Sequence, residues 1–431
     1  MLNSQAASSH RIRIIDIVRG VAVLGIFAIN IQEMALPEEL AFYFQFIDKE
    51  QYFSNFVGAA LEILFYGKMR GLFAILFGVS SMLIIQTLTD PETGSIDARY
   101  YFRRLMWLAA FGLLNSYLFL WWGDILFKYA LLGALLFPLR LASTRSLVVL
   151  AMASLTVLTA QPYLRYSEIA ALKEKVGEVE RNAQQGQVIT PEAEEIKDKW
   201  QERQGDLQPN YSLIDNEVRI KTGEHSALFK YVAWKAFEEQ TTIFYQEDFF
   251  DIFLYMVIGI ILFRFDFFGR RYARQPLQLA IALFGLSLGF LVHAWINWGL
   301  LTSRLDPLKS EYYQIFFDIG RLPFVIGYLS LIIFLFHNEL LKFSGDCLAA
   351  VGRMALSNYL LQSVIGVFLF YGIGLGQFNQ LTRSEIAIII VVVWTFQITF
   401  SVMWMAAFYY GPFEWVWRSL TYSKIQPLRK A

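Results

Sequence analysis

The sequence has a single cysteine and few charged residues. Of its 431 residues, Cys347 is the one cysteine, and only 17% are Asp, Glu, Lys or Arg. A lone cysteine excludes an internal disulfide and a cysteine-rich metal site. Acidic and basic residues are equal in number, 37 each, so no net charge favours nucleic acid as a partner.

Common catalytic and nucleotide-binding motifs are also missing. The sequence contains no GxxxxGK[ST] phosphate loop, no GxSxG nucleophile motif and no HExxH zinc motif. Its four histidines are far apart, at His10, His225, His293 and His337. We therefore expect no metal site and no built-in ATPase.

Apolar residues are abundant instead. They make up 56% of the chain, against about 45–50% in soluble proteins, and the mean hydropathy is +0.42. A stretch of about 20 apolar residues crosses about 30 Å of hydrocarbon. Such stretches occur at 14–33, 70–88, 104–122, 124–142, 145–162, 248–266, 277–299, 318–337, 355–375 and 385–410. They predict an all-α polytopic membrane protein with about ten transmembrane helices.

The stretches divide the chain into two five-span halves. The N-terminal membrane half is predicted to cover 1–162, with a short interfacial helix at 55–67, and the C-terminal half to cover 248–411. Between them, 163–247 lacks a long apolar run and is rich in Glu, Lys and Gln, which predicts an extramembrane helical insertion. Residues 412–431 form a polar tail.

Basic residues predict the orientation. With the N-terminus in the cytoplasm, every segment placed inside carries at least two Lys or Arg residues, as the positive-inside rule requires. Both termini and the tail are then cytoplasmic, and the insertion is extracytoplasmic. The apolar stretch after Arg13 exceeds the length of a signal-peptide core, so we expect it to remain as an anchor.

Ionisable residues inside the predicted spans need a reason, since each costs about 2.5–3.5 kcal/mol at a helix centre. Asp16 and Arg19 are three residues apart on the first span and can pair. They form either a self-neutralising pair or an anion clamp for a cytosolic ligand. His293 is either a packed, hydrogen-bonded histidine or a catalytic one.

Other charges gather at the predicted outer ends of several spans, which predicts a polar, outward-open cavity. Asp124 is placed to cap the fourth span and to pair with Lys128 one turn later. The charged residues of this outer group are Lys68, Arg70, Asp124, Lys128, Asp248, Asp251, Asp318 and Arg321.

Several motifs recur in a known family. They are DIVRG at 16–20, GKMRGLF at 67–73, WGDIL at 122–126, GRMALSNYL at 352–360 and a Gly-Pro to Leu-Thr-Tyr segment at 411–422. With these motifs the chain resembles the YeiB-like bacterial membrane proteins of the DUF418 family. The resemblance implies a bacterial plasma (inner) membrane location, with the lipid bilayer as surroundings.

That family looks related to the wider group of transmembrane acyltransferases, which have an Arg-Gly pair on the first span. The resemblance implies a transmembrane-acyltransferase-like fold, with acyl-CoA as co-substrate and no other cofactor. Donor binding would then involve Asp16, Arg19 and Asn30. The acceptor-side cavity would include Lys68, Arg70, Asn115, Lys128, Asp318 and Arg321.

The chain departs from these relatives at two positions. Asn30 stands where the O-acylating branch has a histidine, and Asn115 stands where some members are expected to have one. The general base would then be Asp124 or His293; the carboxylates Glu33 and Glu62 are further alternatives.

Three functions follow as hypotheses. The first is a membrane acyltransferase moving an acyl group from a cytosolic acyl-CoA-type donor to an envelope or exported small-molecule acceptor. The alternatives are a multi-pass transporter for a small metabolite and a non-catalytic membrane accessory protein; each could form an oligomer. A tunnel joining Arg19 to the Lys68, Arg70 and Asp124 cluster would favour the acyltransferase.

Overall fold

The computed structural model describes residues 2–41, 52–90, 92–188, 190–269, 276–303, 306–337 and 341–430. Regular structure within these residues is helical, without strands; the only β-type pairings there are isolated bridges joining Thr89 to Ile96 and Phe408 to Arg429. The predicted all-helical class is confirmed.

The helices are numbered in the order in which they follow one another along the chain. The first part of the chain forms α1 (Leu2–Ala35), α2 (Glu38–Ala41), α3 (Tyr52–Phe65), α4 (Lys68–Thr87), α5 (Ala98–Tyr117), α6 (Leu126–Leu139) and α7 (Thr144–Gln184). The middle part forms α8 (Pro191–Gly205), α9 (Tyr211–Thr222), α10 (His225–Glu238), the π-helix η3 (Glu239–Asp248) and α11 (Phe249–Arg264). The last part forms α13 (Pro276–Thr302), α14 (Pro307–Gln314), α15 (Phe317–His337), α16 (Lys342–Arg353), α17 (Ala355–Phe370), α18 (Arg383–Ala407) and α19 (Pro412–Tyr422).

Fewer helices are long and apolar enough to cross a membrane than the sequence predicts. Within the described ranges, six qualify, and α16 with α17 would make a seventh if this pair, bent by 77°, is one broken span. The six are Arg13–Ala35, Phe53–Thr87, Thr144–Gln184, Pro276–Thr302, Pro307–Phe336 and Arg383–Ala407. The ten-span count is not confirmed.

Besides 355–375, which corresponds to the bent pair, three predicted spans have no qualifying helix: 104–122, 124–142 and 248–266. Their helices are α5, α6 and α11, of which α6 has 14 residues and α11 has 16. At 1.5 Å per residue, 16 residues rise about 24 Å, which is less than the hydrocarbon thickness. The third helix, α5, has 20 residues but carries three arginines in its first two turns.

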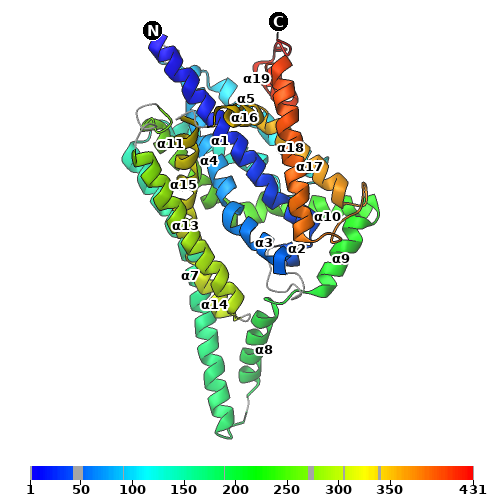
Figure 1. Ribbon diagram of the computed structural model, residues 1–431. Helices are drawn as coiled ribbons and strands as arrows, with labels where there is room; N and C mark the ends of the chain where they lie inside the picture. The colour runs from blue at the N-terminus through cyan, green and yellow to red at the C-terminus, as the bar shows by residue number, and fades with distance from the viewer. Residues whose placement is uncertain are drawn as a thin grey trace.

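The predicted insertion begins inside a continuous helix. The 41-residue helix α7 passes residue 163 without a break and is about 60 Å long. Its far end and α8 project from the end of the molecule opposite to both chain termini (Figure 1). Lys173 of α7 pairs with Asp306, the N-cap of α14, at 2.9 Å, and Arg165 of α7 pairs with Glu311 of α14 at 3.1 Å.

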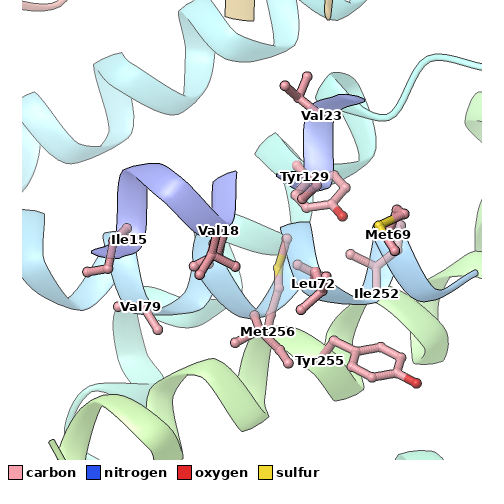
Figure 2. Close-up of a cluster of buried hydrophobic side chains, with 14 of the residues drawn as sticks. Ile15, Val18, Val23, Met69, Leu72, Val79, Tyr129, Ile252, Tyr255 and Met256 are labelled. Atoms are coloured by element: carbon pink, nitrogen blue, oxygen red, sulfur yellow. The ribbon is translucent and has the colours of Figure 1, made fainter. Parts of the chain in front are cut away.

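The interior is formed where α1, α4, α6 and α11 meet (Figure 2). Glycines let α1 and α16 approach closely. A Cβ atom added to Gly20 would lie 2.1 Å from the Leu348 carbonyl oxygen, and one added to Gly352 would lie 1.8 Å from the Asp16 carbonyl oxygen. This contact places Asp16 and Arg19 beside Arg353.

Candidate functional site

A cavity of about 450 Å³ lies between α1, α4, α5, α6, α17 and α19, with the end of α16 in its wall; we call it the inner cavity. Its polar lining includes four arginines and two carboxylates: Arg19, Arg104, Arg353, Arg418, Asp16 and Glu414. Its apolar lining includes Phe73, Leu76, Phe77, Leu105, Leu108, Leu126, Tyr129, Leu356 and Tyr359.

The polar and apolar linings follow one another along α4. Phe73 and Phe77 line the cavity first, Ser80 lines it one turn later, and the apolar Ile84 lines it one turn beyond Ser80. Ser80 accepts a hydrogen bond from Arg19 Nη2 at 3.0 Å, so the guanidinium lies beside the polar turn. The cavity wall therefore combines polar and apolar side chains.

The arginines outnumber the carboxylates that face them. Arg19 pairs with Asp16 at 2.8 Å, which confirms the predicted i, i+3 contact. In the part of the chain that the structure describes, Arg104, Arg353 and Arg418 have no carboxylate within ion-pair distance. Arg104 instead lies 3.6 Å above the Trp417 ring. The inner cavity thus presents excess positive charge.

Glu414 holds α19 against the start of α17. Its Oε1 accepts hydrogen bonds from the amides of Leu356 at 2.7 Å and Ser357 at 3.0 Å, and its Oε2 accepts one from Ser357 Oγ at 2.5 Å. These are amides that a helix N-terminus leaves unpaired. Burial raises the pKa of the Glu414 carboxyl. The contact positions Arg418, one turn further along α19, in the cavity wall.

Two tyrosines form the apolar end of the inner cavity. The Tyr359 hydroxyl donates to Asp124 Oδ1 at 3.4 Å and accepts from the Ile125 amide at 3.2 Å. The Tyr129 hydroxyl donates to the Arg70 carbonyl at 3.1 Å. Asp124 and Arg70 do not themselves line the cavity; they lie directly behind these hydroxyls.

Asp124 is buried and has neutral partners. It accepts hydrogen bonds from Asn115 Nδ2 at 3.0 Å and from the Phe127 amide at 3.0 Å, so it caps α6 as the sequence predicts. The predicted ion pair with Lys128 is wrong. The Lys128 ammonium turns to Glu239, at 2.5 Å, and to Asp248.

The other outer charges form a second cluster, the buried ion network. Three cations alternate in it with four carboxylates, in the order Glu239, Lys128, Asp248, Arg70, Asp251, Arg321 and Asp318. Arg70 Nη1 lies 2.7 Å from Asp248 Oδ1. The network ties α4, α6, η3, α11 and α15 together, and its members do not line the inner cavity.

Lys68 and His293 lie apart from Asp124. Lys68 is fully buried, donates to the Glu62 carbonyl at 3.3 Å and lies 5.4 Å from the Phe317 ring. His293 packs edge-on against the same ring at 5.0 Å. Its buried Nε2 has no hydrogen-bond partner within the described ranges. The two candidate bases, Asp124 and His293, therefore have different surroundings, and His293 does not line the inner cavity.

The expected donor-binding group is brought together only in part. Asp16 and Arg19 line the inner cavity, whereas Asn30 does not; the alternative bases Glu33 and Glu62 do not line it either. Sequence reasoning missed Arg104, Arg353, Arg418 and Tyr359 as site residues. It uses the three arginines as topology signals only, although Arg353 and Arg418 lie within motifs shared with the DUF418 family. Among the described residues, no group of three His, Cys, Asp or Glu side chains is arranged to hold a metal ion.

Comparisons with known proteins agree on one group of relatives. A family model described as a protein of unknown function (DUF418) matches residues 262–424. An uncharacterised protein of Bacillus subtilis, YxaH, is 28% identical over 98% of this chain and 97% of its own length. YeiB of Escherichia coli, also uncharacterised, is 28% identical over 94% and 95%.

A third similar protein, an uncharacterised 39.9 kDa protein in the amylase 3′ region of Bacillus acidopullulyticus, is 25% identical over 98% of this chain and 97% of its own length. No solved structure matches the chain. The matched segment 262–424 contains Arg353, Tyr359, Glu414 and Arg418, while Arg19 and Arg104 lie outside it.

Proposed function

The chain is a YeiB-like protein of the DUF418 family, and from this premise we propose that it is a membrane acyltransferase that binds its acyl-CoA-type donor in the inner cavity. The acyl group would pass to an envelope or exported small-molecule acceptor. The observation that carries the proposal is the combination, in one cavity, of four arginines with an apolar end.

The inner cavity suits a donor that is anionic at one end and apolar at the other. Guanidinium groups bind phosphate in a planar, two-point geometry and remain charged when partly buried. Aliphatic and aromatic walls favour an acyl chain, since burying apolar surface releases about 25 cal/mol per Å². The volume, about 450 Å³, falls in the range of about 300–1,000 Å³ that is typical of small-molecule sites.

Acyl transfer needs a base near the apolar end of the cavity to take the proton of the acceptor. An acceptor O–H or N–H group adds to the acyl carbonyl carbon, and the carbon–sulfur bond of the donor breaks. The acceptor proton passes through the Tyr359 hydroxyl to Asp124, and the leaving thiolate takes up a proton from solvent. Tyr359 is assigned this role because it lines the cavity and donates to Asp124.

We further propose that the acceptor approaches from the side of the buried ion network, with Lys68, Arg70, Lys128, Asp318, Arg321 and Asn115 on its path. The proposed orientation has both termini in the cytoplasm of a bacterial cell. The position of α19 supports this orientation. This helix carries the cavity residue Arg418 and lies at the same end of the molecule as both termini, which is the end that a cytosolic donor would reach (Figure 1).

One observation favours a transporter as the second candidate. Seven charged side chains from five helical elements alternate in sign. Charges inside transporters often mark ion or substrate pathways. In that case the protein would move a small metabolite across the membrane without acylating it.

Donor binding by the variant Arg19→Ala tests the first proposal. Acetyl-CoA and longer acyl-CoAs should raise the melting temperature of the purified wild type more than free CoA does. At 100 times Kd, a ligand adds about 2.7 kcal/mol to the free energy of unfolding. Arg19→Ala should fold and lose this shift. A shift that persists in the variant would remove Arg19 from donor binding; no shift in folded wild type would favour the transporter.

A further inference from the structure

A second hollow of about 520 Å³ lies between α5 and α19. This α5–α19 groove is lined by Arg103, Met106, Trp107, Ser419, Leu420, Ser423, Lys424 and Ile425. It shares no lining residue with the inner cavity. The neighbouring arginines Arg103 and Arg104 therefore line different hollows.

The basic end of the groove is held in place by α19. Arg103 Nη1 donates to Ser423 Oγ at 2.7 Å and to the Thr421 carbonyl at 3.3 Å. Thr421 is in the last turn of α19, where exposed carbonyls favour a cation. Lys424 follows directly and is exposed. Over the described ranges, no carboxylate pairs with Arg103 or Lys424, so both cations remain available to an anion.

The remaining walls of the groove are apolar and open. Met106 is 56% exposed and Ile425 is 80% exposed. One heptad further along α5, Leu113 is also exposed. A soluble anion would gain nothing from this surface, whereas an acyl chain would cover it.

We propose that the α5–α19 groove binds an anionic phospholipid. The lipid phosphate would contact Arg103, Lys424 and Ser423, and one acyl chain would lie against Met106 and follow α5. Basic pockets beside membrane helices bind anionic headgroups in this way. The proposal uses no residue of the inner cavity and holds whether or not the protein transfers an acyl group.

The test is lipid binding to the full-length protein in detergent, followed by native mass spectrometry and melting temperature. The probes are dioleoyl phosphatidylglycerol, dioleoyl phosphatidylcholine and glycerol phosphate. Phosphatidylglycerol should bind and stabilise the wild type, and the other two should not. The double variant Arg103→Gln, Lys424→Gln should bind phosphatidylglycerol about tenfold or more weakly, since each basic side chain contributes about 1 kcal/mol.

The matched control is Arg99→Gln, Arg429→Gln, which removes the same charge from residues outside the groove. It should keep wild-type binding. Equal loss in the control, or equal binding of phosphatidylcholine, would overturn the proposal. Equal stabilisation by glycerol phosphate would identify an anion site rather than a lipid site and would also overturn it. If the double variant does not fold, the single variant Lys424→Gln, at an exposed position, replaces it in the comparison with the wild type.

Discussion

The Tyr359 hydroxyl lies 3.4 Å from Asp124 Oδ1, and it stands between that carboxylate and the inner cavity. Asp124 is 1% exposed and takes its other hydrogen bonds from Asn115 and the Phe127 amide. Tyr359 is the group through which a ligand in the cavity would reach Asp124.

Removing either member of this pair should abolish transfer and spare donor binding. We expect Asp124→Asn and Tyr359→Phe each to lower acyl transfer from acetyl-CoA to hydroxylamine about 10²–10⁴-fold, the usual contribution of acid–base catalysis. The measurement is release of free CoA by the purified protein. Tyr101→Phe is the matched control, because Tyr101 also lines the cavity but donates to the Gly133 carbonyl. Full transfer by Asp124→Asn would exclude Asp124 as the base.

The buried ion network should be costly to open at its centre. Asp251 pairs with both Arg70 and Arg321. Asp251→Asn leaves the buried Arg321 and the partly exposed Arg70 short of charge, and we expect a loss of about 3–5 kcal/mol in the free energy of unfolding. Denaturant titration in detergent measures it.

The control for this prediction is Asp346→Asn, which breaks an exposed pair with Arg13. Its cost should stay within about 0–1 kcal/mol. Equal costs for the two variants would mean that the network is as well solvated as the surface pair.

The contact between α1 and α16 should not tolerate a side chain at Gly352. The added methyl group of Gly352→Ala would meet the Asp16 carbonyl at 1.8 Å. We expect a loss of about 1–3 kcal/mol from overpacking, together with weaker donor binding, because Arg19 and Arg353 flank this contact. Thermal unfolding and acyl-CoA binding measure the two effects. Gly205→Ala, where the added atom meets nothing within 4 Å, should leave both unchanged.

The outer part of α7 should lose its attachment to α14 in acid. Although burial acts to raise the pKa of Asp306, the hydrogen bond and charge of Lys173 lower it below 3.8 overall. The pair therefore stabilises the fold above about pH 3.8 and loses its effect as the pH falls through the lowered pKa. The melting-temperature difference between wild type and Asp306→Asn should shrink between pH 6 and pH 3. A constant difference would contradict this linkage.

Sequence reasoning succeeded where contacts are local or depend on composition. The Asp16–Arg19 pair and the Asp124 cap require only neighbours on one helix, and the helical class requires only apolar content. It failed where partners are distant. Lys128 does not pair with Asp124, four residues away. It pairs with Glu239 and Asp248, which lie more than 100 residues further along the chain.

The number of membrane-spanning helices was also not predicted from the sequence, for a physical reason. Apolar runs such as 248–266 continue past the helix end, so run length overstates the length of α11. The arginines of the inner cavity were not predicted as site residues for another reason. Arg104, Arg353 and Arg418 come from three separate helices, and only the packing of α5, α16 and α19 brings them together.

The central claim, that the inner cavity binds the acyl donor through its arginines, is tested most directly by two neighbouring residues. Arg104 lines the inner cavity and Arg103 lines the α5–α19 groove. Acyl-CoA affinity should fall at least about tenfold in Arg104→Gln, as expected from the loss of one charge-assisted contact, and stay at the wild-type value in Arg103→Gln. Equal affinities in both variants, or no acyl-CoA binding by folded wild type, would contradict the account.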